Sequence, residues 1–201
     1  MFTIGITGGT GSGKTSALRA LKSLGALTLD CDAIYHEILA DNVEIKHELG
    51  ARFEGVLQNG AIDRKQLGAI VFSDPSALQD LNAITHKYIS REIARRIAEW
   101  ESQGGKIAAI DAIALIESGR SEKCDIIIGV TAPKEKRISR IMARDRITRQ
   151  QAELRINAQK PDSFFEENCD YMLESIYEES EEFEKSCRKF FKNILGGYID
   201  A

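Results

Sequence analysis

The sequence predicts an α/β fold in which helices cover both faces of a five-stranded parallel sheet, so that the core has three layers. The first observation is a set of short apolar runs that alternate with helix-like segments near both ends of the chain. These expected strands span residues 2–6, 26–29, 106–110, 125–130 and 169–173. The second observation is a glycine-rich segment directly after the first strand, and the third is a block of helical patterns that interrupts the alternation.

The composition indicates a globular protein. The chain has 201 residues, of which 29% are charged and 43% hydrophobic, and it is long enough for one sizeable core with a smaller subdomain. A net charge of −4 argues against general nucleic-acid binding, and no apolar run approaches the length of a membrane span. The first residues resemble a strand rather than a signal peptide, and the four cysteines lack metal-type spacing. We therefore expect a cytoplasmic protein that binds a small molecule and acts as a monomer or weak homo-oligomer.

The glycine-rich segment Gly8-Gly9-Thr10-Gly11-Ser12-Gly13-Lys14-Thr15 fills the pattern G-x-x-x-x-G-K-[ST] of a P-loop. Glycines allow successive N–H groups to point inward as an anion-binding nest, and the positive end of the following helix favours phosphate. Lys14 would reach the β- and γ-phosphates, and the Thr15 hydroxyl would ligate Mg²⁺. The alternative is a glycine-rich turn that contains a lysine by chance, in about one chain of this length in a hundred. The segment predicts a nucleoside-triphosphate site.

Two carboxylates follow the second expected strand, Asp30 and Asp32. In open α/β sheets the groups that meet the ligand lie at the carboxyl ends of strands, so both are expected beside the P-loop. A carboxylate there can accept the proton of an attacking hydroxyl or help to hold Mg²⁺. The alternative is that one of them caps the helix that follows.

Residues 43–103 contain several helical patterns and no convincing strand. A cap-like Asp63 with a glutamine three residues later begins one helix, and Asp74-Pro75 opens another. Insertions of this kind often close over a second substrate. Within it we single out Arg64 and His86, although each, taken alone, fits a surface arginine or a structural histidine better.

The segment 136–159 predicts a mobile lid made of two short helices. Three arginines share one helix face at spacing i, i+3, i+7: Arg137, Arg140 and Arg144. A capping box of Thr148 and Gln151 begins the second helix, which we expect to hold Arg155 and Gln159. Arginines delivered in this way would neutralise a transferring phosphoryl group, whereas the alternative is a solvated basic helix face.

From near its first residue to about Leu173 the chain resembles the dephospho-coenzyme A kinase family. No later motif is decisive by itself, but the order and spacing of the motifs are specific. The matching segments are Thr7–Thr15, Asp30-Cys31-Asp32, Ile62-Asp63-Arg64 with Leu67-Gly68 and Val71-Phe72, Leu81-Asn82 with His86, and Arg140, Arg144, Arg155-Ile156 and Gln159.

The resemblance implies the last step of coenzyme A biosynthesis, transfer of the γ-phosphate of ATP to the ribose 3′-hydroxyl of dephospho-coenzyme A. It makes Asp32 the expected base, with Lys14 and Arg140 stabilising the transferred charge. The expected nucleotide-binding residues are Gly9, Thr10, Gly11, Ser12, Gly13, Lys14, Thr15, Ser16 and Arg144, with Thr15 also the Mg²⁺ ligand. The expected acceptor-binding residues are Thr7, Asp30, Arg64, Leu67, His86, Leu115 and Glu117.

We expect a single kinase unit of 201 residues with three parts. The nucleotide-binding core comprises residues 1–42, 104–135 and 160–201, the helical acceptor-binding insertion 43–103, and the lid 136–159. The phosphate-binding part is therefore expected to be discontinuous in the sequence.

Three positions depart from the family pattern, mostly on the acceptor side. Lys87 and Ile113 stand where prolines are usual, and the asparagine usual after the last strand corresponds to Glu174. A related P-loop kinase of the nucleoside monophosphate or shikimate type is therefore an alternative. A GTPase-like nucleotide-binding switch is a further alternative, although the chain contains no Asn-Lys-x-Asp guanine motif.

Overall fold

The computed structural model describes residues 1–199, which form two compact units. The first unit comprises Met1–Leu29 and the chain from Glu99 onward, and the second comprises Asp30–Ala98. This division begins the second unit at Asp30, whereas we expected the insertion to begin at residue 43. Each unit is described separately below.

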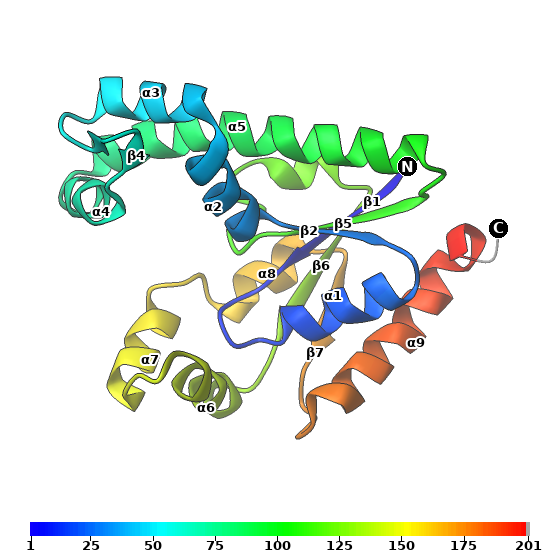
Figure 1. Cartoon of the computed structure of the whole chain (residues 1–201). Coiled ribbons are helices and arrows are strands. Elements are labelled where there is room, and N and C mark those ends of the chain that lie inside the picture. Colours follow the sequence, from blue (N-terminus) through cyan, green and yellow to red (C-terminus); the bar gives the residue numbers. More distant parts are fainter. Residues whose placement is uncertain (200–201) are drawn as a thin grey trace. The chain divides into compact units, whose positions relative to one another are not determined.

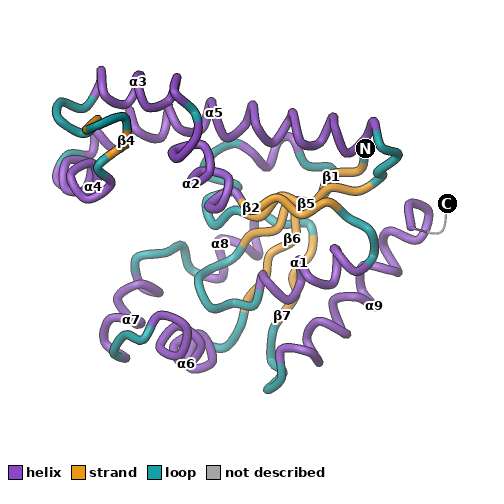
Figure 2. Tube along the Cα trace, viewed as in Figure 1, coloured by secondary structure: helices purple, strands orange, loops and turns teal. Residues whose placement is uncertain are grey.

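The sheet of the first unit confirms the predicted fold class. Its strands are β1 (Phe2–Thr7), β2 (Leu27–Asp30), β5 (Ile107–Asp111), β6 (Ile126–Thr131) and β7 (Tyr171–Glu174), in the order β2-β5-β1-β6-β7 (Figure 2). The described pairings of β1 with β5 and β6, and of β6 with β7, are parallel. Strand β1 is the central strand of the sheet and is paired on both sides, so the loop that follows it starts from a well-supported strand.

Helices cover both faces of this sheet. Helix α1 (Lys14–Ser23) packs against α9 (Ser180–Ile199) over one face, and α8 (Asp162–Asn168) packs against β6 and β7 (Figure 1). A short 3₁₀ helix, η1, spans Arg120–Lys123.

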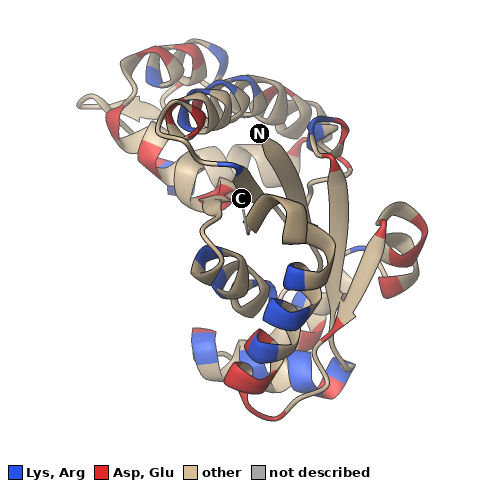
Figure 3. Ribbon diagram, turned by 90° about the vertical axis from the view of Figure 1, so that its right-hand side faces the viewer, with Lys and Arg blue, Asp and Glu red and all other residues tan. Residues whose placement is uncertain are grey.

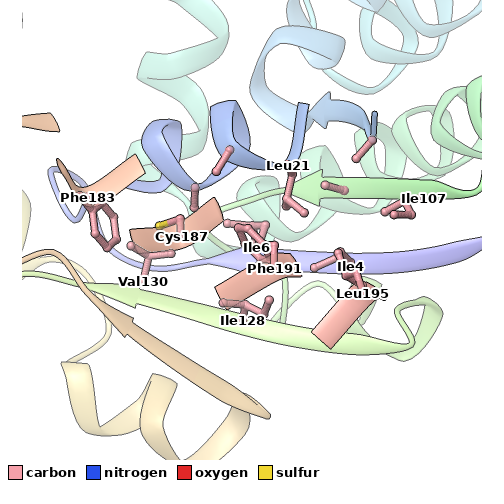
Figure 4. Close-up of a cluster of buried hydrophobic side chains, with 14 residues drawn as sticks. Ile4, Ile6, Leu21, Ile107, Ile128, Val130, Phe183, Cys187, Phe191 and Leu195 are labelled. Carbon is pink, nitrogen blue, oxygen red and sulfur yellow. The ribbon is translucent and has the colours of Figure 1, made fainter. Parts of the chain in front are cut away.

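The main core lies between the sheet and the α1–α9 pair (Figure 4). Ile4 and Ile6 of β1 enter this core, where they meet Leu21 of α1 and Phe191 of α9. Gly5, between the two isoleucines, faces the opposite side of the sheet, where a Cβ would collide with the side chain of Leu115. The strand that leads into the P-loop is therefore packed on both faces, which gives the loop a rigid base.

The lid has a small core of its own. Helices α6 (Lys134–Asp145) and α7 (Arg149–Asn157) enclose four buried residues against the partly buried Ile147: Ile138, Ile141, Ala152 and Ile156. The predicted capping box is present, because Thr148 accepts a hydrogen bond from the N–H of Gln151 and the Gln151 side chain accepts one from the N–H of Thr148. The two helices therefore form a unit that can keep its structure if it moves.

The second unit is helical, as predicted, but it also contains a hairpin that we did not predict. The helices are α2 (Cys31–Asp41), α3 (Val43–Arg52), α4 (Arg64–Ser73) and α5 (Pro75–Ser102), of which α5 continues into the first unit. Strands β3 (Leu57–Gln58) and β4 (Ala61–Ile62) pair antiparallel. Two-residue strands carry no readable alternation, but Asn59-Gly60, with φ of 50° and 77°, is the expected signal of a tight hairpin turn.

Two predictions made from composition can be compared with the structure. The four cysteines are free thiols: Cys31, Cys124, Cys169 and Cys187. Among the helices of residues 1–199, none combines the length and apolarity that crossing a membrane requires.

Candidate nucleotide-binding site

The P-loop comes directly after β1, and its backbone conformation requires glycine at several positions. Gly8, Gly11 and Gly13 have φ of 138°, 79° and 109°, which side chains rarely adopt. A Cβ on Gly8 would also collide with the backbone carbonyl of Val130 on β6. Three glycines of the motif are thus explained by backbone geometry, and this geometry is of the kind that forms an anion-binding nest.

The groups at the start of α1 suit a phosphate. The N-cap of α1 is Gly13, which makes no side-chain capping hydrogen bond, and the first turn of the helix contains no acid. Lys14 Nζ donates to the carbonyl of Gly8 at 2.9 Å and so extends back over the loop. Ser12 Oγ is buried and has no hydrogen-bond partner among the described residues. Helix N–H groups, a cation and an unsatisfied hydroxyl together fit an anionic ligand.

Thr15 and Ser16 occupy the first turn of α1 in different surroundings. Thr15 is exposed, whereas Ser16 is buried. No group of three or more His, Cys, Asp or Glu residues within residues 1–199 is arranged to hold a metal ion. A Mg²⁺ ion that takes most of its ligands from phosphates and water, and one from a hydroxyl such as that of Thr15, fits these residues.

Two arginines of α6 contact the P-loop. Arg140 Nη1 donates to the carbonyl of Gly11 at 3.1 Å, and its Nη2 donates to Ser175 Oγ at 3.0 Å. Arg137 Nε donates to the carbonyl of Thr10 at 3.0 Å. Arg137 is 5% exposed, so it does not belong to a solvated helix face. These two residues fit the predicted delivery of arginines from the lid to the loop.

Arg144 lies in different surroundings from Arg137 and Arg140. Its Nε donates to Asp145 Oδ1 at 2.7 Å, and Arg155 Nη1 donates to Asp145 Oδ2 at 2.5 Å. The hydrogen bond from Arg144 lowers the pKa of Asp145, and the same bond raises the pKa of Arg144. Figure 3 shows that basic and acidic segments are interspersed along the ribbon. The predicted common face of three arginines is therefore divided in this structure.

Two positions near the lid and the last strand need correction. Gln159 lies beyond the end of α7 rather than on it, and it bonds to Thr10. Strand β7 runs one residue further than predicted, so Glu174 is its last residue and the residue after it is Ser175. Ser175 is buried beside Gly13, and its N–H donates to the carbonyl of Thr131 at 2.7 Å. We did not predict Ser175, because a single serine carries no sequence signal.

In the second unit, the two expected carboxylates have different surroundings. Asp30 is the N-cap of α2, and its Oδ1 accepts hydrogen bonds from the N–H groups of Asp32 and Ala33 at 2.9 and 3.1 Å. The capping alternative therefore applies to Asp30. Asp32 lies exposed in the first turn of α2.

Arg64 and His86 lie on separate helices of this unit. Arg64, the first residue of α4, is exposed, and its Nη2 lies 3.5 Å from His36 Nε2. His86 is half-buried on α5.

Lys87, which follows His86 where the family has proline, links α5 to α3. Its Nζ donates to Glu48 at 2.9 Å, and the Tyr88 hydroxyl donates to the same carboxylate at 2.7 Å. Burial, together with the hydrogen bond to Glu48, raises the pKa of Tyr88 to about 12. The departure at Lys87 is therefore accommodated within the second unit by a local ion pair.

Three residues expected at the acceptor are buried: Thr7, Leu67 and Leu115. Thr7 Oγ1 donates to the carbonyl of Ile113, and Leu115 packs where a side chain on Gly5 would lie. Both side chains therefore make contacts inside the protein. The predicted contacts of Thr7, Leu67 and Leu115 with the acceptor remain predictions, made for side chains that are buried in this structure. Glu117, by contrast, lines a cavity of about 370 Å³ together with Ile113, Gln159, Lys160 and Phe165.

Comparisons with known proteins show to which family the chain belongs. Residues 2–178 match the sequence model of the dephospho-CoA kinase family. A dephospho-CoA kinase of Geobacter sulfurreducens is 40% identical over 163 residues, which cover 80% of this chain and 83% of that protein. A solved dephospho-CoA kinase from Campylobacter jejuni is 26% identical with a TM-score of 0.70, covering 97% of this chain and 98% of that one. A shikimate kinase from Acinetobacter baumannii, 17% identical over 98% of this chain and 94% of its own with a TM-score of 0.55, shares the fold alone. This chain belongs to the dephospho-CoA kinase family.

Proposed function

We propose that this protein transfers the γ-phosphoryl group of ATP to the ribose 3′-hydroxyl of dephospho-CoA, giving ADP and CoA. The observation that carries the proposal is the family match over residues 2–178, a span that includes a complete P-loop. The free thiols are consistent with the cytoplasmic location that we expected.

The P-loop and the start of α1 are the proposed site for the phosphates of ATP. Thr15 would ligate Mg²⁺, which when bound neutralises charge on the phosphates. Lys14, already bonded across the loop, has the reach to contact the β- and γ-phosphates. Arg140 is held by Gly11 and Ser175, so its positive charge is not cancelled by a carboxylate in those contacts. Lys14 and Arg140 are the groups that we propose to stabilise the transferred charge.

Asp32 is the proposed base for the acceptor hydroxyl. Asp30 is the residue that caps α2, so the Asp32 carboxylate is not used as the cap. It can therefore accept a proton. Arg64, with His36 nearby, is a candidate for an anionic group of the acceptor, and His86 and Glu117 remain proposed acceptor contacts. The first unit would therefore bind the nucleotide, and most of the proposed acceptor contacts belong to the second unit, with Glu117 as the exception.

The test is a coupled assay of ADP release with ATP and, in parallel, dephospho-CoA, shikimate, gluconate and nucleoside monophosphates. We expect ADP release with dephospho-CoA, which gives CoA as the product, and none with the other acceptors. Turnover with another acceptor but not with dephospho-CoA would overturn the proposal.

Asp32→Asn tests the base. We expect it to lower kcat by at least about 100-fold while ATP affinity stays within a few-fold, because the amide cannot take the proton. Asp41→Asn is the matched control, since Asp41 is an exposed carboxylate at the other end of α2. Near-normal turnover of Asp32→Asn would remove Asp32 from the catalytic role.

A further inference from the structure

Thr10, near the tip of the P-loop, is bound at every polar group it has. Its N–H donates to Gln159 Oε1 at 2.9 Å, its carbonyl accepts from Arg137 Nε at 3.0 Å, and its hydroxyl accepts from Gln159 Nε2 at 2.7 Å. The pattern G-x-x-x-x-G-K-[ST] places no requirement on this position. The partners of Thr10 lie more than 120 residues away in sequence, on either side of α7.

Arg137 and Gln159 are also bound to each other. Arg137 Nη2 donates to Gln159 Oε1 at 3.0 Å, so that one amide oxygen accepts from both Thr10 and Arg137. Arg137 Nη1 lies 3.4 Å from Asp162 Oδ1. Burial lowers the pKa of Arg137, with Asp162 acting in the opposite direction, but arginine stays charged in proteins. A buried positive charge is thus held directly behind a loop built to receive an anion.

Gly9 provides independent evidence that Arg137 packs closely against the P-loop. A Cβ at Gly9 would collide with the guanidinium of Arg137 and would lie 3.0 Å from Gln159 Oε1. The φ of Gly9, unlike those of Gly8, Gly11 and Gly13, is not in the positive range. Glycine at this position is therefore explained by the close approach of Arg137 rather than by backbone strain.

We propose that Arg137 and Gln159 are positioning residues that clamp Thr10 and hold the P-loop in its phosphate-binding conformation. The proposal rests on ATP being the phosphoryl donor. A loop with four glycines loses much conformational entropy when it orders around a ligand, and contacts already formed in the free protein reduce that cost. Arg137 comes from α6 and Gln159 follows α7, so the clamp joins both ends of the lid to the loop.

The clamp predicts a specific kinetic signature. Removal of either residue should weaken ATP binding, since the loop must then be ordered by the nucleotide itself. It should leave kcat at saturating ATP and the KM for dephospho-CoA largely unchanged, because neither side chain is proposed to touch the reacting atoms. A purely structural role would instead lower the melting temperature and the fraction of active protein, with a normal ATP Kd in the active fraction.

The experiment measures the ATP Kd by calorimetry, with the acceptor absent, and then steady-state kinetics. Arg137→Met and Gln159→Leu should each weaken ATP binding by about tenfold, the scale expected for losing hydrogen bonds to a charged group. The double variant should be little worse than either single variant, because the two residues act on the same threonine. Gln159→Glu should bind ATP within about threefold of the wild type, since a carboxylate keeps both accepting contacts and Thr10 can donate its hydroxyl proton.

Lys134→Ala is the matched control, since Lys134 is an exposed cation one turn before Arg137 on the same helix. It should bind ATP as the wild type does. An unchanged ATP Kd in Arg137→Met and Gln159→Leu, or a loss confined to kcat, would overturn the clamp. Because ATP binding is measured without acceptor, a wild-type protein that binds ATP but does not phosphorylate dephospho-CoA would count against the proposed function and leave the clamp testable.

Discussion

The inner arginines of the lid, Arg137 and Arg140, differ from the outer arginines, Arg144 and Arg155, in what they bind. The inner pair donates to backbone carbonyls of Thr10 and Gly11. The outer pair shares the carboxylate of Asp145. Arg137, Arg140 and Arg144 follow one another on a single helix at regular spacing, so spacing alone does not distinguish them.

The difference in partners determines which arginine charges are available to a nucleotide. A carbonyl oxygen holds a guanidinium without cancelling its charge, so Arg140 keeps a positive potential at the loop, whereas Arg137 also has a carboxylate neighbour, Asp162, at 3.4 Å. The single carboxylate of Asp145 offsets only one of the two positive charges of the outer arginines, and these exposed ion pairs add little stability. We infer that the inner pair serves the nucleotide and that the outer pair joins α6 to α7 in this conformation.

The largest expected effect separates Arg140 from Arg144. Arg140→Ala should lower kcat by at least about 100-fold, as the loss of an arginine that stabilises a transferring phosphoryl group does. Arg144→Ala should cost less than about fivefold, because its charge is committed to Asp145. Steady-state rates at saturating ATP and acceptor provide the test. Equal losses in the two variants would show that the lid rearranges to bring Arg144 to the nucleotide.

A smaller effect is expected from Ser175, which supports Arg140. Ser175→Ala removes the acceptor for Arg140 Nη2, while the bond from Nη1 to Gly11 remains. We expect kcat to fall by roughly three- to tenfold, the scale of one hydrogen bond to a charged group. In the Arg140→Ala background the same substitution should have almost no further effect, as measured by a double-mutant cycle. Independent, additive losses would mean that Ser175 acts in some other way.

The smallest effect is a dependence of the lid on pH. Asp145 has a folded-state pKa below its ordinary value of 3.8, so its contribution to stability is present above that value and is lost as the pH falls through the lowered pKa. The inner arginines contact the loop through backbone carbonyls, which do not titrate, and Arg137 has in addition the carboxylate neighbour Asp162. Hydrogen-exchange protection of α7, corrected for intrinsic rates, should therefore fall below a pH of about 4 before protection of the Thr10 N–H does.

Asp145→Asn provides the control for this experiment, because it should give α7 the lower protection already at neutral pH and remove most of its further change on acidification. Simultaneous loss of protection at Thr10 and in α7 would contradict the distinction between inner and outer contacts.

Local patterns predicted the elements whose partners lie nearby in sequence. The P-loop, the cap at Asp63 and the Thr148–Gln151 box are each formed by a few consecutive residues, so their chemistry is visible without the fold. The Asn59-Gly60 hairpin was visible in the same way, but we did not predict it because its strands have only two residues each.

Local sequence patterns did not predict which residues are buried or which residues make long-range contacts. Leu115 and Thr7 were expected at the acceptor, yet both are buried in the first unit. The division of labour between Asp30 and Asp32 also needed the structure, because both are suitable helix caps and only the geometry of α2 shows that Asp30 fills that role.

The sequence by itself determined that this protein has a P-loop on an α/β sheet, with an arginine-rich lid and a helical insertion, because each of these follows from a local arrangement of residue types. Only the tertiary structure decided which arginines meet the loop and that Ser175, Gln159 and Thr10 belong with them. The physical reason is that helical spacing sets the direction of a side chain relative to its own helix, whereas its partners are set by what packs against that helix from distant parts of the chain.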